Sequence, residues 1–123
     1  MILGPLLGTA LVVAVATNPL NDLTAKASPS TQERIAATEP LVRSATDCIV
    51  RVVIADPRYT AKPTPQLGEL IVDSVPSCLT PVRAMIAAYD RYYGEGSGEA
   101  FFMGPYLDVL PKAVLAGARD ARQ

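Results

Sequence analysis

Apolar residues recur in steps of three and four along the segment that runs from Ser30 to Asp56. This spacing is typical of one face of an α-helix. The segment opens with Ser30-Thr31-Gln32-Glu33, a capping box in which Ser30 and Glu33 accept hydrogen bonds from each other's backbone N–H groups. Pro40 lies inside it, so we expect the helix to kink or restart there before Asp56-Pro57 ends it. Its apolar stripe beyond the proline consists of Leu41, Ala45, Cys48, Ile49 and Val52.

Two further apolar stripes follow a proline-rich loop, and each begins at a Thr-Pro pair. Thr64-Pro65 places a capping hydroxyl before a proline at the first helical position, and Val75-Pro76 ends that helix. Thr80-Pro81 repeats the same start, and Gly94 is a typical terminating residue. The stripes are Leu67, Leu70, Ile71 and Val75, and then Val82, Met85, Ile86, Tyr89 and Tyr93.

The remaining sequence contains a glycine-rich link at 94–98, one or two helical turns at 99–103 and a break at Gly104-Pro105. A last helix with a kink at Pro111 follows. No alternating strand pattern bounded by hairpin turns is present. The β-branched run 49–54 is the only segment that could form a strand, and the helical stripe that begins at Leu41 continues through it. The sequence therefore predicts an all-α fold, a small bundle of four to five short helices, with residues 30–123 as a single helical domain.

The first sixteen residues are uncharged and almost wholly apolar, and they end in Ala14-Val15-Ala16. This small-x-small pattern favours a signal peptide at 1–16 and a flexible leader at 17–29, although no Lys or Arg precedes the apolar run. As a helix the run spans about 24 Å, short of the roughly 30 Å hydrocarbon core of a bilayer. We expect a periplasmic or secreted protein that meets a membrane only if this segment stays uncleaved; an uncleaved anchor and a buried N-terminal helix are the alternatives.

Two cysteines, Cys48 and Cys78, lie 30 positions apart in the chain. In an oxidising compartment an even count in a small domain indicates a disulfide, and two cysteines allow one intramolecular pairing. Closing that loop is worth about 3.7 kcal/mol in the chain-entropy treatment. The alternatives are two buried free thiols or a redox-active pair, but catalytic pairs are usually two residues apart.

Composition excludes several functions. The chain of 123 residues has room for one domain, and 50% hydrophobic residues are too many for a disordered chain. Basic and acidic residues number 11 and 12 and the basic ones are scattered, so we expect no nucleic-acid partner. Histidine is absent, which removes Ser-His-Asp, Cys-His and zinc–histidine sites. The glycine-rich link lacks the Lys-Ser/Thr of a phosphate loop. We expect no catalytic residue, no metal and no cofactor.

Six of the seven aromatic residues fall between Tyr89 and Tyr106. One interpretation is a core in which Tyr89, Tyr93, Phe101 and Tyr106 pack together. The pairs Tyr92-Tyr93 and Phe101-Phe102, however, cannot bury all their members on one helix face. The sequence therefore predicts Tyr89, Tyr93 and Phe101 in the core, and a candidate binding surface formed by Tyr92, Phe102, Arg91, Glu95 and Glu99.

These features indicate a small exported helical binding module without catalytic activity, whose partner is a protein or a small apolar ligand. Periplasmic acid-stress chaperones are also small, helical and single-bridged, so a stress or chaperone-like protein is an alternative that rests on architecture without a shared motif. An enzyme of unknown type is the third hypothesis, disfavoured because the commonest general base is missing.

Overall fold

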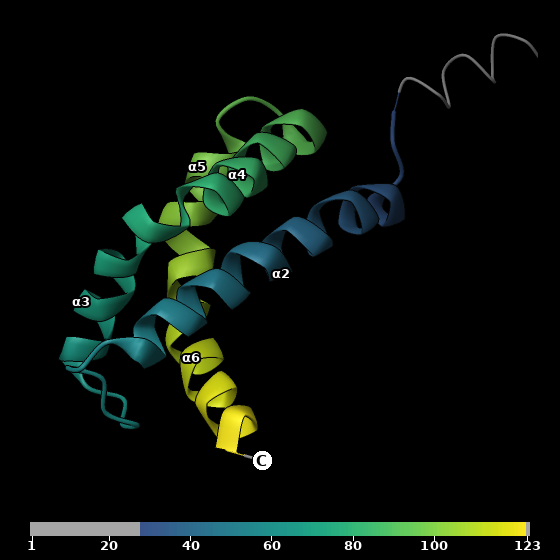
Figure 1. Cartoon of the computed structure of the whole chain (residues 1–123). Helices are drawn as coiled ribbons and strands as arrows, with labels where there is room; N and C mark the ends of the chain where they lie inside the picture. The colour runs from purple at the N-terminus through teal and green to yellow at the C-terminus, as the bar shows by residue number, and fades with distance from the viewer. Residues whose placement is uncertain (1–27, 123) are drawn as a thin grey trace, which may run out of the picture. The chain divides into compact units, whose positions relative to one another are not determined.

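The computed structural model describes residues 28–122, and within them the chain is helical without a strand. The predicted signal peptide at 1–16 and the leader up to residue 27 lie outside the described residues. Figure 1 shows the order of the helical segments. They are α2 (Thr31–Ala55), α3 (Pro65–Ser74), the 3₁₀ turn η1 (Val75–Cys78), α4 (Leu79–Tyr93), α5 (Ser97–Phe101), the π-helical turn η2 (Phe102–Tyr106) and α6 (Leu107–Arg122).

Within the described part of the chain, these segments join into three continuous helical stretches, 31–55, 65–93 and 97–122. The all-α prediction is confirmed, but the expectation of four to five separate helices is wrong. The 3₁₀ turn η1 accommodates Pro76, and the π turn η2 accommodates Pro105, without a break in the helical path. Short 3₁₀ and π segments change the hydrogen-bond register, so a proline can lie there at less cost than inside a regular α-helix.

Thr80-Pro81 does not begin a helix as predicted. Helix α4 begins two residues earlier, at Leu79, and Cys78 is its N-cap. Pro81 then falls in the first turn of α4, where the backbone N–H groups have no partner within the helix and the loss of one is tolerated. Pro40 and Pro111 likewise lie inside α2 and α6, which continue through them.

The predicted boundaries at Ser30, Pro65 and Gly94 are confirmed, whereas α5 begins at Ser97, inside the predicted link at 94–98. Ser30 N–H donates to Glu33 Oε1 at 3.4 Å and Glu33 N–H donates to Ser30 Oγ at 3.1 Å, which completes the capping box. Thr64 caps α3 with Pro65 in its first turn, although its side chain makes no capping hydrogen bond. Gly94 ends α4 with φ of 111°, a backbone conformation that favours glycine.

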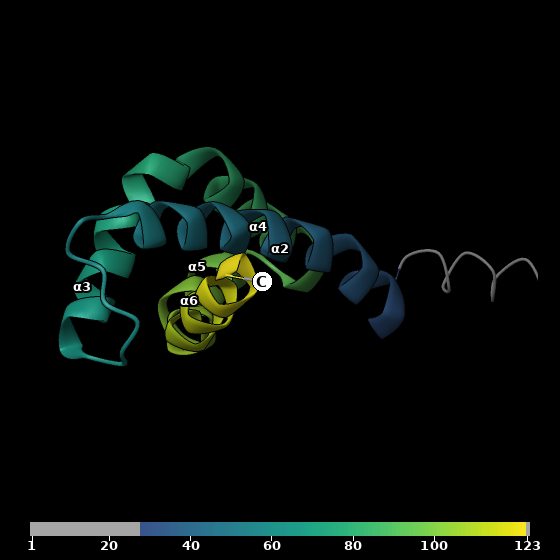
Figure 2. The ribbon, with the colours of Figure 1, turned by 60° about the horizontal axis from the view of Figure 1, so that its bottom comes forward.

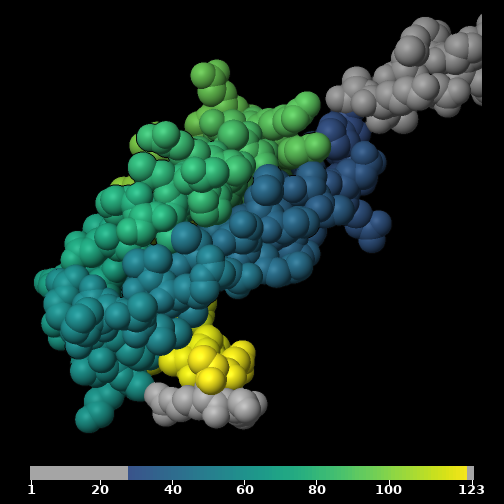
Figure 3. Space-filling model, viewed as in Figure 1, coloured from purple at the N-terminus to yellow at the C-terminus, as the bar shows by residue number. Residues whose placement is uncertain are grey.

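From Arg34 onward the chain forms one compact unit in which the three helical stretches share a hydrophobic core. Helix α2 crosses α6, where Gly117 lies against Val50, and the 65–93 stretch covers another side of α2 (Figure 2). The space-filling view shows α2 and α4 side by side on one face (Figure 3). The core consists of Ala45, Ile49, Val53, Leu67, Leu70, Ile71, Cys78, Val82, Met85, Tyr106, Leu110 and Val114.

The predicted disulfide between Cys48 and Cys78 is present. It ties the middle of α2 to the junction of η1 and α4, and Cys78 is fully buried there. A chain of this size buries a modest share of its surface, so a covalent tie between two helical stretches is a substantial part of its stability.

Five of the seven aromatic residues form one series of neighbouring rings. Tyr93 stacks on Tyr89 at a centroid distance of 5.2 Å, Tyr89 stacks on Phe101 at 4.1 Å, and Tyr106 lies 5.5 Å from Phe101. Phe102 ends the series, 5.9 Å from Tyr106. Tyr106 is the only aromatic side chain fully buried among the described residues, at 1% exposure.

Tyr93 is 41% exposed, so its predicted place in the core is wrong. It lies in the last turn of α4, beyond the point at which the helix is covered, and the Arg34 guanidinium lies 5.6 Å from its ring centroid. Tyr89 and Phe101 are half-buried and pack against the core from its edge.

Candidate functional site

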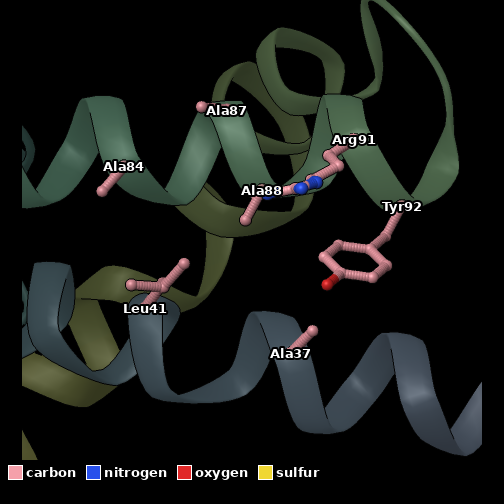
Figure 4. A pocket seen from close by; sticks show the side chains of 7 residues that line it. All are labelled: Ala37, Leu41, Ala84, Ala87, Ala88, Arg91 and Tyr92. Atoms are coloured by element: carbon pink, nitrogen blue, oxygen red, sulfur yellow. The ribbon is translucent and has the colours of Figure 1, made fainter.

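Helices α2 and α4 are separated by a groove with a volume of about 340 Å³, which we name the α2–α4 groove. Figure 4 shows its lining, with two side chains from α2 on one wall and the others from α4. The lining residues are Ala37, Leu41, Ala84, Ala87, Ala88, Arg91 and Tyr92.

The groove is hollow because most of its lining side chains are alanines. A methyl group reaches too short a distance to fill the space between two helices whose separation is set elsewhere. The Cys48–Cys78 disulfide holds α2 to the start of α4, and the contact of Arg34 with the Tyr93 ring lies at the end of α4. The two helices are therefore held at both ends of a segment that lacks large side chains.

One end of the α2–α4 groove is polar. The Arg91 side chain extends back toward Ala88, and the Tyr92 hydroxyl points into the space between the helices (Figure 4). Arg91 is exposed, and the ion pairs formed by the described residues, Arg43–Glu39, Arg58–Asp56 and Arg58–Asp73, do not include it. This groove thus combines an apolar surface with one unpaired guanidinium.

A second groove, with a volume of about 310 Å³, lies where α3 and η1 face η2 and α6; we name it the Phe102 groove. All of its lining side chains are apolar, and two of them are exposed to an unusual degree, Val72 at 59% and Met103 at 62%. The lining residues are Val72, Val75, Pro76, Phe102, Met103 and Leu107.

The structure divides the predicted binding residues between these two places. Arg91 and Tyr92 lie together in the α2–α4 groove, whereas Phe102 lines the Phe102 groove. Glu95, in the glycine-rich link, and Glu99, in α5, are exposed and line neither groove. Tyr92 and Phe102, which we expected at the surface, are both half-buried, because each forms the wall of a groove instead of standing out from the molecule.

Sequence reasoning missed Val72 and Met103. Val72 follows the buried residues Leu70 and Ile71 on α3, and it falls on the outer face of that helix. Met103 lies directly before Gly104-Pro105, a pair that was interpreted only as a break between two helices. An apolar residue outside the buried stripe is the signal that identifies each of them.

Asp90, Asp56 and Asp73 have structural partners. Asp90 Oδ1 accepts hydrogen bonds from Gly96 N–H at 3.1 Å and Gly98 N–H at 2.8 Å, which holds the link against the end of α4. Arg58 donates to Asp56 and Asp73, and its hydrogen bonds lower the pKa of Asp56. Among residues 28–122, no group of three or more acidic or cysteine side chains is placed to hold a metal ion.

Tyr106, the one fully buried tyrosine, makes a specific hydrogen bond. The Tyr106 and Thr46 hydroxyls are 2.9 Å apart, which joins η2 to α2 across the core. Burial raises the pKa of Tyr106, and the negative charge of Asp47 adds to that effect, while the hydrogen bond between Tyr106 and Thr46 opposes it. At neutral pH this residue is a neutral structural side chain.

The chain matches no protein-family model, and no curated protein or solved structure is detectably similar to it. The continuous stretch Pro65–Tyr93 is long and apolar enough to cross a membrane by length and composition alone. Within this stretch Leu70, Ile71 and Val82 are buried in the core, whereas Val72 and Leu79 are exposed.

Proposed function

We propose that the protein is a small exported helical binding module, without catalytic activity, that receives apolar side chains of a partner protein in the Phe102 groove. The observation that carries this proposal is the groove itself, which is lined only by apolar residues and open to water. Apolar surface exposed in a contiguous hollow is characteristic of interaction sites in soluble proteins. Phe102 and Met103 are also residue types that interfaces favour.

A protein partner fits this groove better than a small apolar ligand does. Val72 and Met103 stand at 59% and 62% exposure, on opposite walls. A ligand confined to the groove leaves much of both side chains in water. A partner protein covers the groove and its rim together, and burial of apolar area is worth about 25 cal/mol per Å².

Export is part of the proposal, and the disulfide supports it. Disulfides persist in oxidising compartments and are rare in the cytosol. The apolar segment that ends at Ala14-Val15-Ala16 is the sequence feature that supports a signal peptide. Expressed in a Gram-negative host, the protein is expected in the periplasm with Thr17 as its first residue. Intact mass spectrometry of the recovered protein tests this, and a product that retains Met1 contradicts it.

The binding proposal is tested with a photo-crosslinking amino acid at Met103, with Val109 as the matched control. Both are exposed apolar side chains in the same helical stretch, but Val109 does not line the groove. We expect a discrete crosslinked product at Met103, absent at Val109, and abolished by Val72→Asp.

Equal products at Met103 and Val109 contradict the proposal. Crosslinking to many different unfolded proteins instead of a discrete partner supports the chaperone-like alternative. The thermal stability of Val72→Asp serves as the control for folding, and we expect it unchanged because Val72 is exposed.

A further inference from the structure

We propose that the α2–α4 groove is a second, separate binding site, and that its ligand is a small free carboxylate with an apolar body. This site is distinct from the Phe102 groove, because the two share no lining residue. The proposal rests on the placement of one unpaired cation at the end of an apolar hollow.

The charge of the groove selects an anion. Arg91 is the one charged residue that lines it, and no carboxylate among the described residues forms an ion pair with this guanidinium. A guanidinium presents a planar fork of N–H donors that matches a carboxylate in a bidentate geometry. The Tyr92 hydroxyl, which points into the same space, supplies a further donor (Figure 4). An ammonium ligand would meet a like charge here and no acceptor carboxylate.

The walls of the groove select an apolar body. Leu41 and the alanines of α2 and α4 present methyl and methylene groups to the hollow. A bare inorganic anion at Arg91 leaves this apolar surface in water, and a hydrocarbon leaves the Arg91 guanidinium without an anionic partner. A molecule with a carboxylate at one end and a short apolar chain pairs with Arg91 and also covers the apolar walls.

The size of the groove limits the ligand to a small molecule. Its volume of about 340 Å³ lies at the low end of small-molecule sites, which span roughly 300–1,000 Å³. Octanoate, with its carboxylate and seven further carbons, is a suitable probe. Octan-1-ol has the same chain without the charge, and octylammonium has the opposite charge.

Arg91 also has a structural role that the test must separate from binding. It lies in the last turn of α4, where a cation stabilises the helix whether or not a ligand is present. Arg83 is an exposed arginine on the same helix that does not line the groove, so Arg83→Gln is the matched control for Arg91→Gln. Ala84→Leu fills the hollow from α4, and Ala36→Leu is its control at an exposed position of α2 outside the groove.

The experiment titrates the oxidised, purified protein with each probe and follows backbone amide signals by NMR. We expect saturable shifts from octanoate that centre on Ala84–Tyr92 and Ala37–Leu41, and no saturable shifts from octylammonium. Octan-1-ol should bind at least tenfold more weakly than octanoate. Arg91→Gln and Ala84→Leu should each weaken octanoate binding by about tenfold or more, and their two controls should leave it within about twofold.

Several results would overturn this proposal. Equal binding of octanoate and octan-1-ol removes the role of the cation. Unchanged affinity in Arg91→Gln or in Ala84→Leu removes the groove as the site. Shifts that centre on Val72 and Met103 assign the probe to the Phe102 groove. The photo-crosslinking experiment at Met103 is independent of all of these, so each proposal can fail without the other.

Discussion

Helix α4 has a close neighbour on one side and a distant one on the other. Against α5, Gly98 packs so tightly that a Cβ atom there would overlap the carbonyl oxygen of Ile86. Against α2, Ala84 and Ala88 face Ala37 and Leu41, yet the two helices leave a hollow of about 340 Å³. Small residues line both helix contacts, and only one of them is closed.

The difference shows that small side chains permit close approach but do not enforce it. On the α5 side, the short glycine-rich link and the hydrogen bonds of Asp90 to Gly96 and Gly98 draw the two helices together. On the α2 side, the disulfide holds one end, the Arg34–Tyr93 contact lies at the other, and no short link joins the helices between them. The same residue type therefore forms a tight contact in one place and a groove in the other.

The largest expected effect lies in the core that these helices share. Tyr106→Ala should lower the free energy of unfolding by about 3–5 kcal/mol, because it removes a fully buried aromatic side chain. Tyr93→Ala, at an exposed position of the same aromatic series, should cost about 1 kcal/mol or less. Urea denaturation of both variants measures the difference, and equal losses would show that the exposed end is as tightly packed as the centre.

Removal of the disulfide tests how the open side is held. The Cys48→Ser/Cys78→Ser double variant should lose about 3 kcal/mol, which lowers Tm by about 12–24 °C in a domain of this size. In the unreduced, unfolded wild-type protein, neither cysteine should react with an alkylating agent. Two reactive thiols, or an unchanged Tm in the double variant, would show that other contacts hold α2 to α4.

Gly98→Ala probes the closed contact directly. The added methyl group overlaps backbone at Ile86, so the helices must separate, and we expect a loss of about 1–3 kcal/mol. Gly104→Ala is the matched control, since no atom would meet its Cβ within 4 Å. That substitution should be neutral or slightly stabilising, as alanine is the better helix former. Similar losses in both variants would show that the close approach of Gly98 to Ile86 does not govern the effect.

Tyr106→Phe gives the smallest effect, about 1 kcal/mol, because it deletes the hydrogen bond to Thr46 and keeps the ring. Burial raises the pKa of Tyr106 above its ordinary value of 10.0, so the folded state favours the neutral phenol. The stability that the neutral phenol contributes is fully present below the unfolded-state pKa of 10.0, and it is lost as the pH rises through the raised pKa of the folded state. Unfolding free energies compared at about pH 8 and about pH 10.5 should fall less in Tyr106→Phe than in wild type. A fall of the same size in both proteins would contradict this assignment. Burial also raises the pKa of Tyr89, which accounts for the part of the fall that persists in Tyr106→Phe.

Local rules predicted those parts of the fold that depend on a few neighbouring residues. The capping box at Ser30 and Glu33, the start of α3 at Pro65 and the end of α4 at Gly94 are all confirmed. The disulfide was predictable because two cysteines allow one pairing. Val75-Pro76 and Gly104-Pro105 were interpreted as helix breaks, and this was wrong because 3₁₀ and π turns absorb these prolines when packing holds the flanking helices in line. Asp56-Pro57, in contrast, follows the end of α2 as predicted.

The candidate site was harder to predict from the sequence, because it depends on which helices pack against each other. The sequence placed Arg91 and Tyr92 on a candidate binding surface, but it contained no information on Ala37 and Leu41 of α2, which complete their groove. It also grouped Phe102 with them, since the three are close in sequence, whereas the turn η2 directs Phe102 to another groove.

By itself, the sequence determined the helical class, most helix ends and the covalent tie, because propensity, capping and cysteine pairing act over a turn of helix or through a single bond. Only the tertiary structure decided which aromatic side chain is buried. Tyr93 and Tyr106 are the same residue type, but Tyr93 lies where α4 is no longer covered, and Tyr106 lies where α2 covers η2 and Thr46 meets its hydroxyl. The burial of a side chain depends on which helices pack against it, and the sequence around either tyrosine does not predict where those helices lie.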